Sequence, residues 1–324
     1  MRVLITGAAG QDGTILASLL ERESIDAFGL IKPGTDASLL RSYAPRIDIA
    51  EVDLADVQSL RGAMREMEPT HVYNFGGFTS PSASWQYPEE VRAINVDAVR
   101  VMLEEISTGT PSTHFFQASS SHVFEGTDRS PQDETFEPSP ESPYAKSKAD
   151  ALSLVRAARA DKGVFAVSGI LYNHESPLRS ENFVTRKISR AVARIAAGLQ
   201  EVLELGDIEV ARDWGWAPDY VRAMRLMMEA DAPRDYVLAT GISHRLSFFV
   251  AKAFLAGGLP NWRDYVIAGE SDRPVDTNKM VGDSRRAYQE LGWRHTVDFD
   301  LMAATMVAND IALLQDPDYL WLDF

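Results

Sequence analysis

Two residues four positions apart, Tyr144 and Lys148, could carry out acid–base chemistry on an alcohol. On a helix, this spacing puts both side chains on one face. A nearby ammonium stabilises a tyrosinate, so the tyrosine could act as a base nearer neutral pH. Ser120 follows an expected strand, and its hydroxyl could bond the reacting oxygen. We predict that these three side chains act together on a substrate hydroxyl.

A glycine-rich turn near the start of the chain indicates the second reactant. The sequence GAAGQDG at positions 7–13 directly follows an expected strand at 3–6 and begins an expected helix at 12–22. Such spacing lets the backbone approach a pyrophosphate, while the helix N-terminus offers free N–H groups. This context predicts a dinucleotide site, and with Tyr144 and Lys148 it predicts hydride transfer. The cofactor-binding residues expected here are Gly7, Gly10, Gln11, Asp12 and Gly13.

The residue that ends the second expected strand bears on the choice of cofactor. NAD sites usually place an acid there. This chain has Lys32 instead, which could face a 2′-phosphate or simply solvent. We therefore predict NADP, with NAD as the alternative. Asp53 and Leu54, after the third strand, are further expected contacts, Asp53 to the adenine.

Short apolar runs alternate with helical patterns through the first half of the chain. This alternation predicts a doubly wound parallel sheet of the Rossmann type, whose ligands bind at the carboxyl ends of the strands. We assign residues 1–172 to a dinucleotide-binding domain, to which later segments return, and 173–324 mainly to a smaller, interlocked C-terminal substrate lobe. Expected strands are 3–6, 27–31, 49–52, 71–75, 114–118, 164–171, 201–205 and 236–240; expected helices are 12–22, 57–67, 88–106, 143–162, 183–198, 219–229, 246–256, 284–291 and 299–314.

Composition excludes several classes of function. The chain has no cysteine, and its net charge of −15 disfavours a nucleic-acid surface, which needs clustered Lys and Arg. The sequence contains no run of 18 apolar residues, so we expect no membrane span. The N-terminus does not resemble a signal peptide. The histidines lack metal-ligand spacing. We expect a cytoplasmic enzyme without a metal, a nucleic-acid partner or a membrane partner.

Several motifs identify a family. They are GAAGQDG at 7–13, SPY at 142–144, GILYNHESP at 169–177, NFVTRKI at 182–188, RDWG at 212–215 and ELGW at 290–293. In order and spacing, over nearly the whole chain, they resemble the extended short-chain dehydrogenase/reductases and, within them, the GDP-mannose 4,6-dehydratase family. The resemblance implies a GDP-hexose substrate, GDP-mannose or a relative. It also implies a homodimer or homotetramer built through helices 88–106 and 143–162.

The resemblance further implies a set of substrate-binding residues. Some would contact the nucleotide or its diphosphate, and an arginine suits phosphate oxygens because it binds them with two hydrogen bonds. One arginine would lie beside the guanosine, one acid would hold a ribose hydroxyl and one serine would bind the sugar. By matching position, the contacts to the nucleotide or its diphosphate would be Asn173, Asn182, Lys187 and Arg212. The arginine beside the guanosine would be Arg273, the acid Asp276 and the serine Ser84.

One motif departs from the family pattern at two positions. Dehydration there begins with oxidation at C4; a glutamate then removes the C5 proton and helps water leave C6. This chain has His122 in place of that glutamate and Phe124 in place of the following tyrosine. Imidazole can serve as acid and base near neutral pH. Either His122 carries the dehydration, or the step is lost and the protein is a GDP-sugar epimerase or a 4-keto-sugar reductase. A histidine that only fills the pocket, and a non-catalytic nucleotide sensor, are further alternatives.

Overall fold

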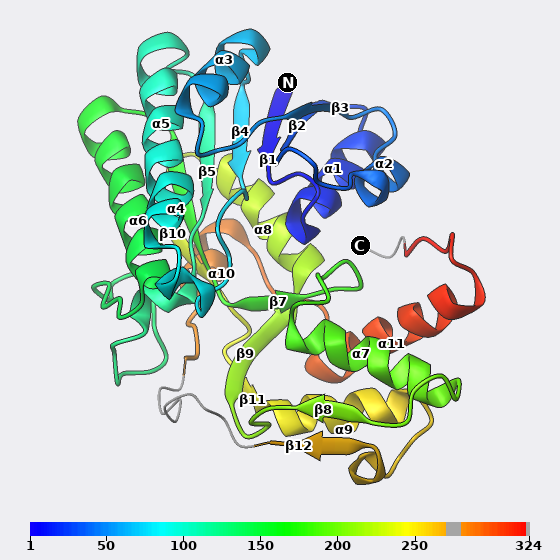
Figure 1. The fold of residues 1–324 in the computed structure, drawn as a ribbon. Helices are drawn as coiled ribbons and strands as arrows, with labels where there is room; N and C mark the ends of the chain where they lie inside the picture. The colour runs from blue at the N-terminus through cyan, green and yellow to red at the C-terminus, as the bar shows by residue number, and fades with distance from the viewer. Residues whose placement is uncertain (270–279, 322–324) are drawn as a thin grey trace.

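The computed structural model describes residues 1–269 and 280–321, and its centre is a seven-stranded sheet (Figure 1). All of its neighbouring strands pair in parallel, in the order β10-β6-β5-β4-β1-β2-β3. Strand order reverses between β1 and β4, so the carboxyl ends of these two strands form the switch point where such sheets bind ligands. The strands are β1 (Arg2–Thr6), β2 (Asp26–Ile31), β3 (Asp48–Glu51), β4 (His71–Asn74), β5 (His114–Ala118), β6 (Ala166–Leu171) and β10 (Asp235–Leu238).

Helices cover both faces of this sheet, and each face has its own core. Successive strand residues point to opposite faces. In β1, Val3 and Ile5 therefore join the core under α1 and α8, whereas Leu4 joins the core under α3, α5 and α6. The helices of this part are α1 (Gln11–Arg22), α2 (Ser38–Tyr43), α3 (Val57–Met67), α4 (Pro88–Arg92), α5 (Ala98–Gly109), α6 (Pro143–Lys162), α8 (Ala217–Met228) and α10 (Arg285–Leu291).

A smaller lobe lies beyond the carboxyl ends of the strands, at the bottom of Figure 1. Its core is formed by apolar side chains of three helices and of β8 and β9, among them Val192, Trp214, Phe249 and Met306. Trp321 is buried against Trp216 with ring centroids 5.2 Å apart, so the end of the described chain covers part of this core. The elements are α7 (Val184–Ala196), α9 (Leu246–Ala256), α11 (Phe299–Gln315), β7 (Asn173–Glu175), β8 (Leu203–Leu205), β9 (Ala211–Trp216), β11 (Ser243–Arg245) and β12 (Val266–Ala268).

The predicted doubly wound parallel sheet is confirmed, and most predicted elements occur within a few residues of their expected bounds. The predicted helix 88–106 is interrupted: a π-helical segment, Ala93–Asp97, separates α4 from α5. The strands β7, β9, β11 and β12 and the helix α2 were not predicted. Within the described ranges, every helix is too short or too polar to cross a membrane.

Candidate active site

The glycine turn after β1 is packed too tightly to accept side chains at two of its glycines. Gly7 has a φ of +64°, and a Cβ there would lie 2.7 Å from the amide nitrogen of Gly76. A Cβ on Gly13 would lie 2.6 Å from the carbonyl oxygen of Gly7. Both contacts are with backbone atoms, which cannot move aside as a side chain could. Gly7 therefore allows the turn to pack against the end of β4, where the switch point lies, and Gly13 allows the start of α1 to pack against the turn itself.

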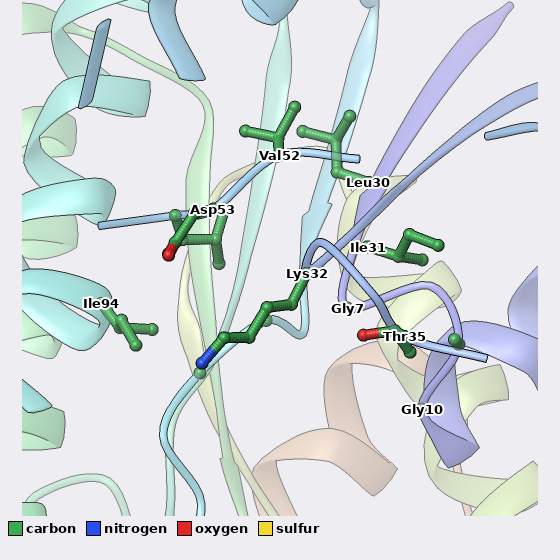
Figure 2. Close-up of a pocket in the computed structure, with 13 residues that line it drawn as sticks. Gly7, Gly10, Leu30, Ile31, Lys32, Thr35, Val52, Asp53 and Ile94 are labelled. Carbon is green, nitrogen blue, oxygen red and sulfur yellow. The ribbon is translucent and has the colours of Figure 1, made fainter. Parts of the chain in front are cut away.

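A cavity of about 330 Å³ opens beside this turn, at the carboxyl ends of β1 to β4 (Figure 2). It begins at the glycines whose backbone a pyrophosphate would approach and extends to the ends of β2 and β3, where an adenosine belongs in this fold. The residues present thus fit a dinucleotide. The cavity is lined by Gly7, Ala9, Gly10, Leu30, Ile31, Lys32, Thr35, Val52, Asp53, Leu54, Gly76, Gly77 and Ile94.

Three predicted cofactor residues, Lys32, Asp53 and Leu54, line the cavity. Figure 2 shows the Lys32 side chain leaving the end of β2 and reaching toward the side where Ile94 lies. The Lys32 side chain is 65% exposed, and its Nζ lies 3.6 Å from a carboxylate oxygen of Glu90. Exposed pairs of this kind are weak. The ammonium can therefore turn to an anionic group at low cost.

The side chains of Gln11 and Asp12 do not line this cavity. Gln11 donates to the carbonyl oxygen of His174 at 3.1 Å and accepts from the hydroxyl of Ser176 at 2.8 Å. One carboxylate oxygen of Asp12 lies 2.9 Å from Nε2 of His174. Burial alone would lower the pKa of His174, but the charge and hydrogen bond of Asp12 raise it overall. These side chains join the glycine turn to the segment at 174–176, and only the backbone of Gln11 and Asp12 is left to serve a pyrophosphate.

Ser120, Tyr144 and Lys148 meet where β5 ends and α6 begins. All three are buried. The Ser120 side chain hydrogen-bonds the Tyr144 phenol. Nζ of Lys148 lies 5.8 Å from the centroid of the tyrosine ring and donates to the carbonyl oxygen of Ala118 at 3.0 Å. A Cβ added to Gly77, which lines the cavity, would lie 3.6 Å from the same Nζ. The group is therefore adjacent to the cavity.

The electrostatics of this group differ from the expectation. Burial raises the pKa of Tyr144, and the hydrogen bond from Ser120 offsets this only in part. Burial also lowers the pKa of Lys148 from 10.5 to about 8. The prediction that the Lys148 ammonium brings the tyrosine pKa toward neutrality is wrong for the polypeptide alone, because burial raises the pKa of Tyr144 and Lys148 is not among the groups that lower it.

A buried asparagine that the sequence analysis missed supports the site. Asn95 lies in the π-helical segment; its Oδ1 accepts from the Phe78 amide at 2.8 Å, and its Nδ2 donates to Ser147 Oγ at 2.9 Å. Ser147 in turn donates to the carbonyl oxygen of Tyr144 at 2.7 Å. Asn95 therefore joins the loop after β4 to the helix that carries the tyrosine. A polar residue within the apolar stripe of 88–106 was the available signal.

The structure places His122 beside Tyr144. Its ring stands edge-on to the phenol, with ring centroids 5.5 Å apart and an interplanar angle of 84°. Nδ1 of His122 is hydrogen-bonded to a carboxylate oxygen of Glu125, which the sequence analysis also missed. The spacing of three residues within one turn was the signal that could have revealed Glu125.

The predicted substrate residues are more dispersed. Ser84 is fully buried; it donates to the Pro81 carbonyl at 2.6 Å and accepts from the Tyr144 amide at 3.2 Å, so it holds the start of α6 rather than facing a cavity. Asn182 lines a second cavity, next to the glycine turn. The others lie on α7 or on strands of the smaller lobe, or outside the described residues. Asn173 is on β7, Lys187 on α7, where it donates to the Glu204 carbonyl at 2.7 Å, and Arg212 on β9, where it donates to the Ala211 carbonyl at 2.8 Å; Arg273 and Asp276 lie outside the described residues.

The doubly wound sheet and the glycine turn, together with the family match, define an enzyme of the extended short-chain dehydrogenase/reductase type, in the nucleotide-sugar dehydratase/epimerase class. Residues 4–306 match the family model for GDP-mannose 4,6 dehydratase. The chain belongs to the GDP-mannose 4,6-dehydratase family.

Individual relatives agree with this assignment. GDP-mannose 4,6 dehydratase 2 of Arabidopsis thaliana is 38% identical over 325 residues, which cover 96% of this chain and 87% of that protein. Solved structures share the fold, and two of them serve as examples. The UDP-glucose 4-epimerase of Thermus thermophilus, in complex with NAD, has a TM-score of 0.83 at 24% identity and covers 96% of this chain and 99% of its own. RMD from Pseudomonas aeruginosa, complexed with NADPH, has a TM-score of 0.81 at 22% identity and covers 96% and 98%.

Proposed function

We propose that this protein is a nicotinamide-dependent dehydratase that converts a GDP-hexose, GDP-mannose or a close relative, to its 4-keto-6-deoxy product. One observation carries the proposal: a serine, a tyrosine, a lysine and a histidine meet at the end of β5, next to a cavity fit for a dinucleotide. The family relatives that are named for action on GDP-mannose support the choice of substrate.

The first part of the reaction belongs to Ser120, Tyr144 and Lys148. Tyr144 would take the proton of the C4 hydroxyl while Ser120 bonds the same oxygen. Lys148, whose Nζ is next to Gly77 of the cavity, would bond the cofactor ribose. When bound, an oxidised nicotinamide would supply a hydride acceptor at C4, a hydride donor for C6 and a positive charge that favours the phenolate. The product of this half is a ketone at C4.

The second part belongs to His122. A C4 ketone acidifies the proton on C5. His122 would take that proton, the freed electron pair would form the C5–C6 double bond, and the C6 hydroxyl would leave as water after accepting a proton from the imidazolium. Hydride addition at C6, and transfer to C5 of the proton that Tyr144 took from the C4 hydroxyl, would complete the cycle. No net oxidation results.

Lys32 supports NADP as the cofactor. It is an exposed cation at the rim of the cavity, on the side where the adenosine ribose belongs. Arg212 and Lys187 remain proposed contacts to the diphosphate of the substrate, Asn173 and Asn182 to its nucleotide. Arg273 and Asp276 are proposed for the guanosine end. We also propose a homodimer or homotetramer formed through α4, α5 and α6.

The test is incubation with GDP-mannose and NADP, followed by mass spectrometry and carbonyl trapping. Loss of one water with a trapped ketone and no net NADPH is the expected result. A product of unchanged mass would instead indicate an epimerase, and consumption of NADPH with an added keto sugar would indicate a reductase. Tyr144→Phe is the matched variant: turnover equal to that of the unaltered protein would overturn the hydride-transfer assignment.

A further inference from the structure

His122 contacts two members of the proposed hydride-transfer group, Ser120 and Tyr144. It lies on a short 3-10 turn, Ser121–Phe124, and its backbone amide donates to Ser120 Oγ at 3.3 Å. Its ring meets the Tyr144 phenol edge-on. His122 and Tyr144 are therefore fixed relative to each other. The remaining question is which ring nitrogen of His122 accepts the proton from the substrate.

Glu125 occupies one of those nitrogens. It accepts at Nδ1 of His122, and it also accepts from the Ser142 amide at 3.1 Å and from the Ser142 hydroxyl at 2.9 Å. Ser142 is the N-cap of α6, since its Oγ accepts from the Ala145 amide at 3.1 Å. The carboxylate is thus fastened to the start of the helix that carries Tyr144, at the end of the helix where a negative charge is favourable.

The environment keeps this carboxylate ionised. The Glu125 side chain is 17% exposed, and the His122 side chain 25%. Burial raises the pKa of Glu125, but the hydrogen bond and charge of His122 and the two hydrogen bonds from Ser142 outweigh it, so the pKa lies below its usual range. An ionised carboxylate can only accept, so neutral His122 must carry its proton on Nδ1.

We propose that Glu125 is a positioning residue for His122: by accepting the Nδ1 proton it selects the tautomer whose free nitrogen, Nε2, takes the C5 proton, and its charge stabilises the imidazolium. Among the described residues, no hydrogen bond engages Nε2. The proton taken from C5 is the one given to the departing C6 hydroxyl, so the pair is unchanged over the cycle. The inference rests on the proposed function and deepens it.

A kinetic experiment separates this role from a merely structural one. Glu125→Gln keeps the shape and can still accept from Ser142, but its NH₂ can donate to Nδ1 and favour the other tautomer. With GDP-mannose, we expect kcat for dehydration to fall about 100-fold, as for partners that orient a working histidine. KM and the pre-steady-state reduction of NADP at C4 should change little. Glu141→Gln, an exposed carboxylate in the same loop, is the matched control and should change neither.

Nitrogen-15 NMR of the histidine rings tests the tautomer directly and needs no turnover. The chain has six histidines, and the signal missing from His122→Gln assigns the ring. We expect Nδ1 of neutral His122 to be protonated in the unaltered protein, and the tautomer to shift in Glu125→Gln. A proton on Nε2 in the unaltered protein, or identical spectra in both, would overturn the inference even if Glu125→Gln folds poorly.

The two assays distinguish a failure of the proposed function from a failure of the positioning role of Glu125. If GDP-mannose is not dehydrated but Nδ1 is protonated through Glu125, the proposed function fails and the assignment of the tautomer stands. If dehydration proceeds and Glu125→Gln retains the kcat of the unaltered protein, the positioning role fails and the proposed function stands.

Discussion

Replacing Lys148 by methionine is expected to stabilise the protein while it removes activity. The Lys148 side chain is almost fully buried, and its Nζ has one hydrogen bond, to the carbonyl oxygen of Ala118 at 3.0 Å. Burial lowers its pKa from 10.5 to about 8. In the unfolded chain the ammonium is hydrated, so below pH 8 folding must desolvate a charge. Methionine has a similar length and carries no charge.

The magnitude follows from the two pKa values. A tenfold change in an ionisation constant corresponds to about 1.4 kcal/mol, so the buried ammonium costs about 3 kcal/mol near pH 7. The lost hydrogen bond offsets about 1 kcal/mol of the gain, which leaves about 2 kcal/mol. Between pH 8 and 10.5 the unfolded chain binds more protons than the folded one, so stability of the unaltered protein rises with pH. The advantage of Lys148→Met should therefore fall to near zero by about pH 9.5.

Thermal unfolding of the cofactor-free protein measures this difference. For a chain of this size, about 2 kcal/mol corresponds to a rise in Tm of about 3 °C at neutral pH. Lys146→Met, which removes an exposed lysine of the same helix, is the control and should leave Tm within about 1 °C. Dehydration by Lys148→Met should fall at least about 100-fold. A lower Tm at neutral pH, or a gain that does not change with pH, would refute the reasoning.

The remaining predictions concern the cofactor site. Gly13→Ala should abolish NADPH binding in a fluorescence titration, because the added Cβ would lie 2.6 Å from a backbone oxygen. Its control is Gly62→Ala, which lies in open space on a helix and should stabilise the folded protein by about 0.5 to 1 kcal/mol. Asp12→Asn should cost about 3 kcal/mol near pH 6 in urea unfolding, because buried His174 loses its partner. The pKa of His174 is raised above 6.5, so the stabilisation by the Asp12–His174 pair is complete below that pH and is lost as the pH rises through the raised value. An equal cost of Asp12→Asn at low and high pH would contradict this. Lys32→Ala should raise Kd for NADP about tenfold and change Kd for NAD little, and equal changes would speak against a phosphate contact.

The parts of the fold that are encoded locally could be predicted from the sequence. Helix α6 has the predicted bounds because Ser142 caps it, Pro143 begins it and Gly163, at a φ of +64°, ends it. Helix α3 likewise follows a capping Asp56. The meeting of Ser120, Tyr144 and Lys148 was predictable for the same reason, since strand end and helix start are local features.

What the sequence could not reveal depends on distant contacts. Strand β9 mixes charges with aromatics, and its buried Asp213 is tolerated only because it accepts from the amides of Thr240, Gly241 and Gly282. Strands β7, β11 and β12 have three residues each, too few for a periodic pattern. The site shows the same limit: Glu125 gains its place through Ser142, 17 residues further along.

The hydrogen bonds from Gln11 and Asp12 to His174 and Ser176 have a mechanical consequence. They couple the first helix to the opening stretch of the smaller lobe across more than 160 positions of chain. We therefore expect these two segments to move together. A motion that opens the cofactor cavity would then have to bend the chain at another point. A dinucleotide bound at the turn would contact the same unit that includes Asn173, a proposed substrate contact, so binding of one ligand would make the site of the other more rigid.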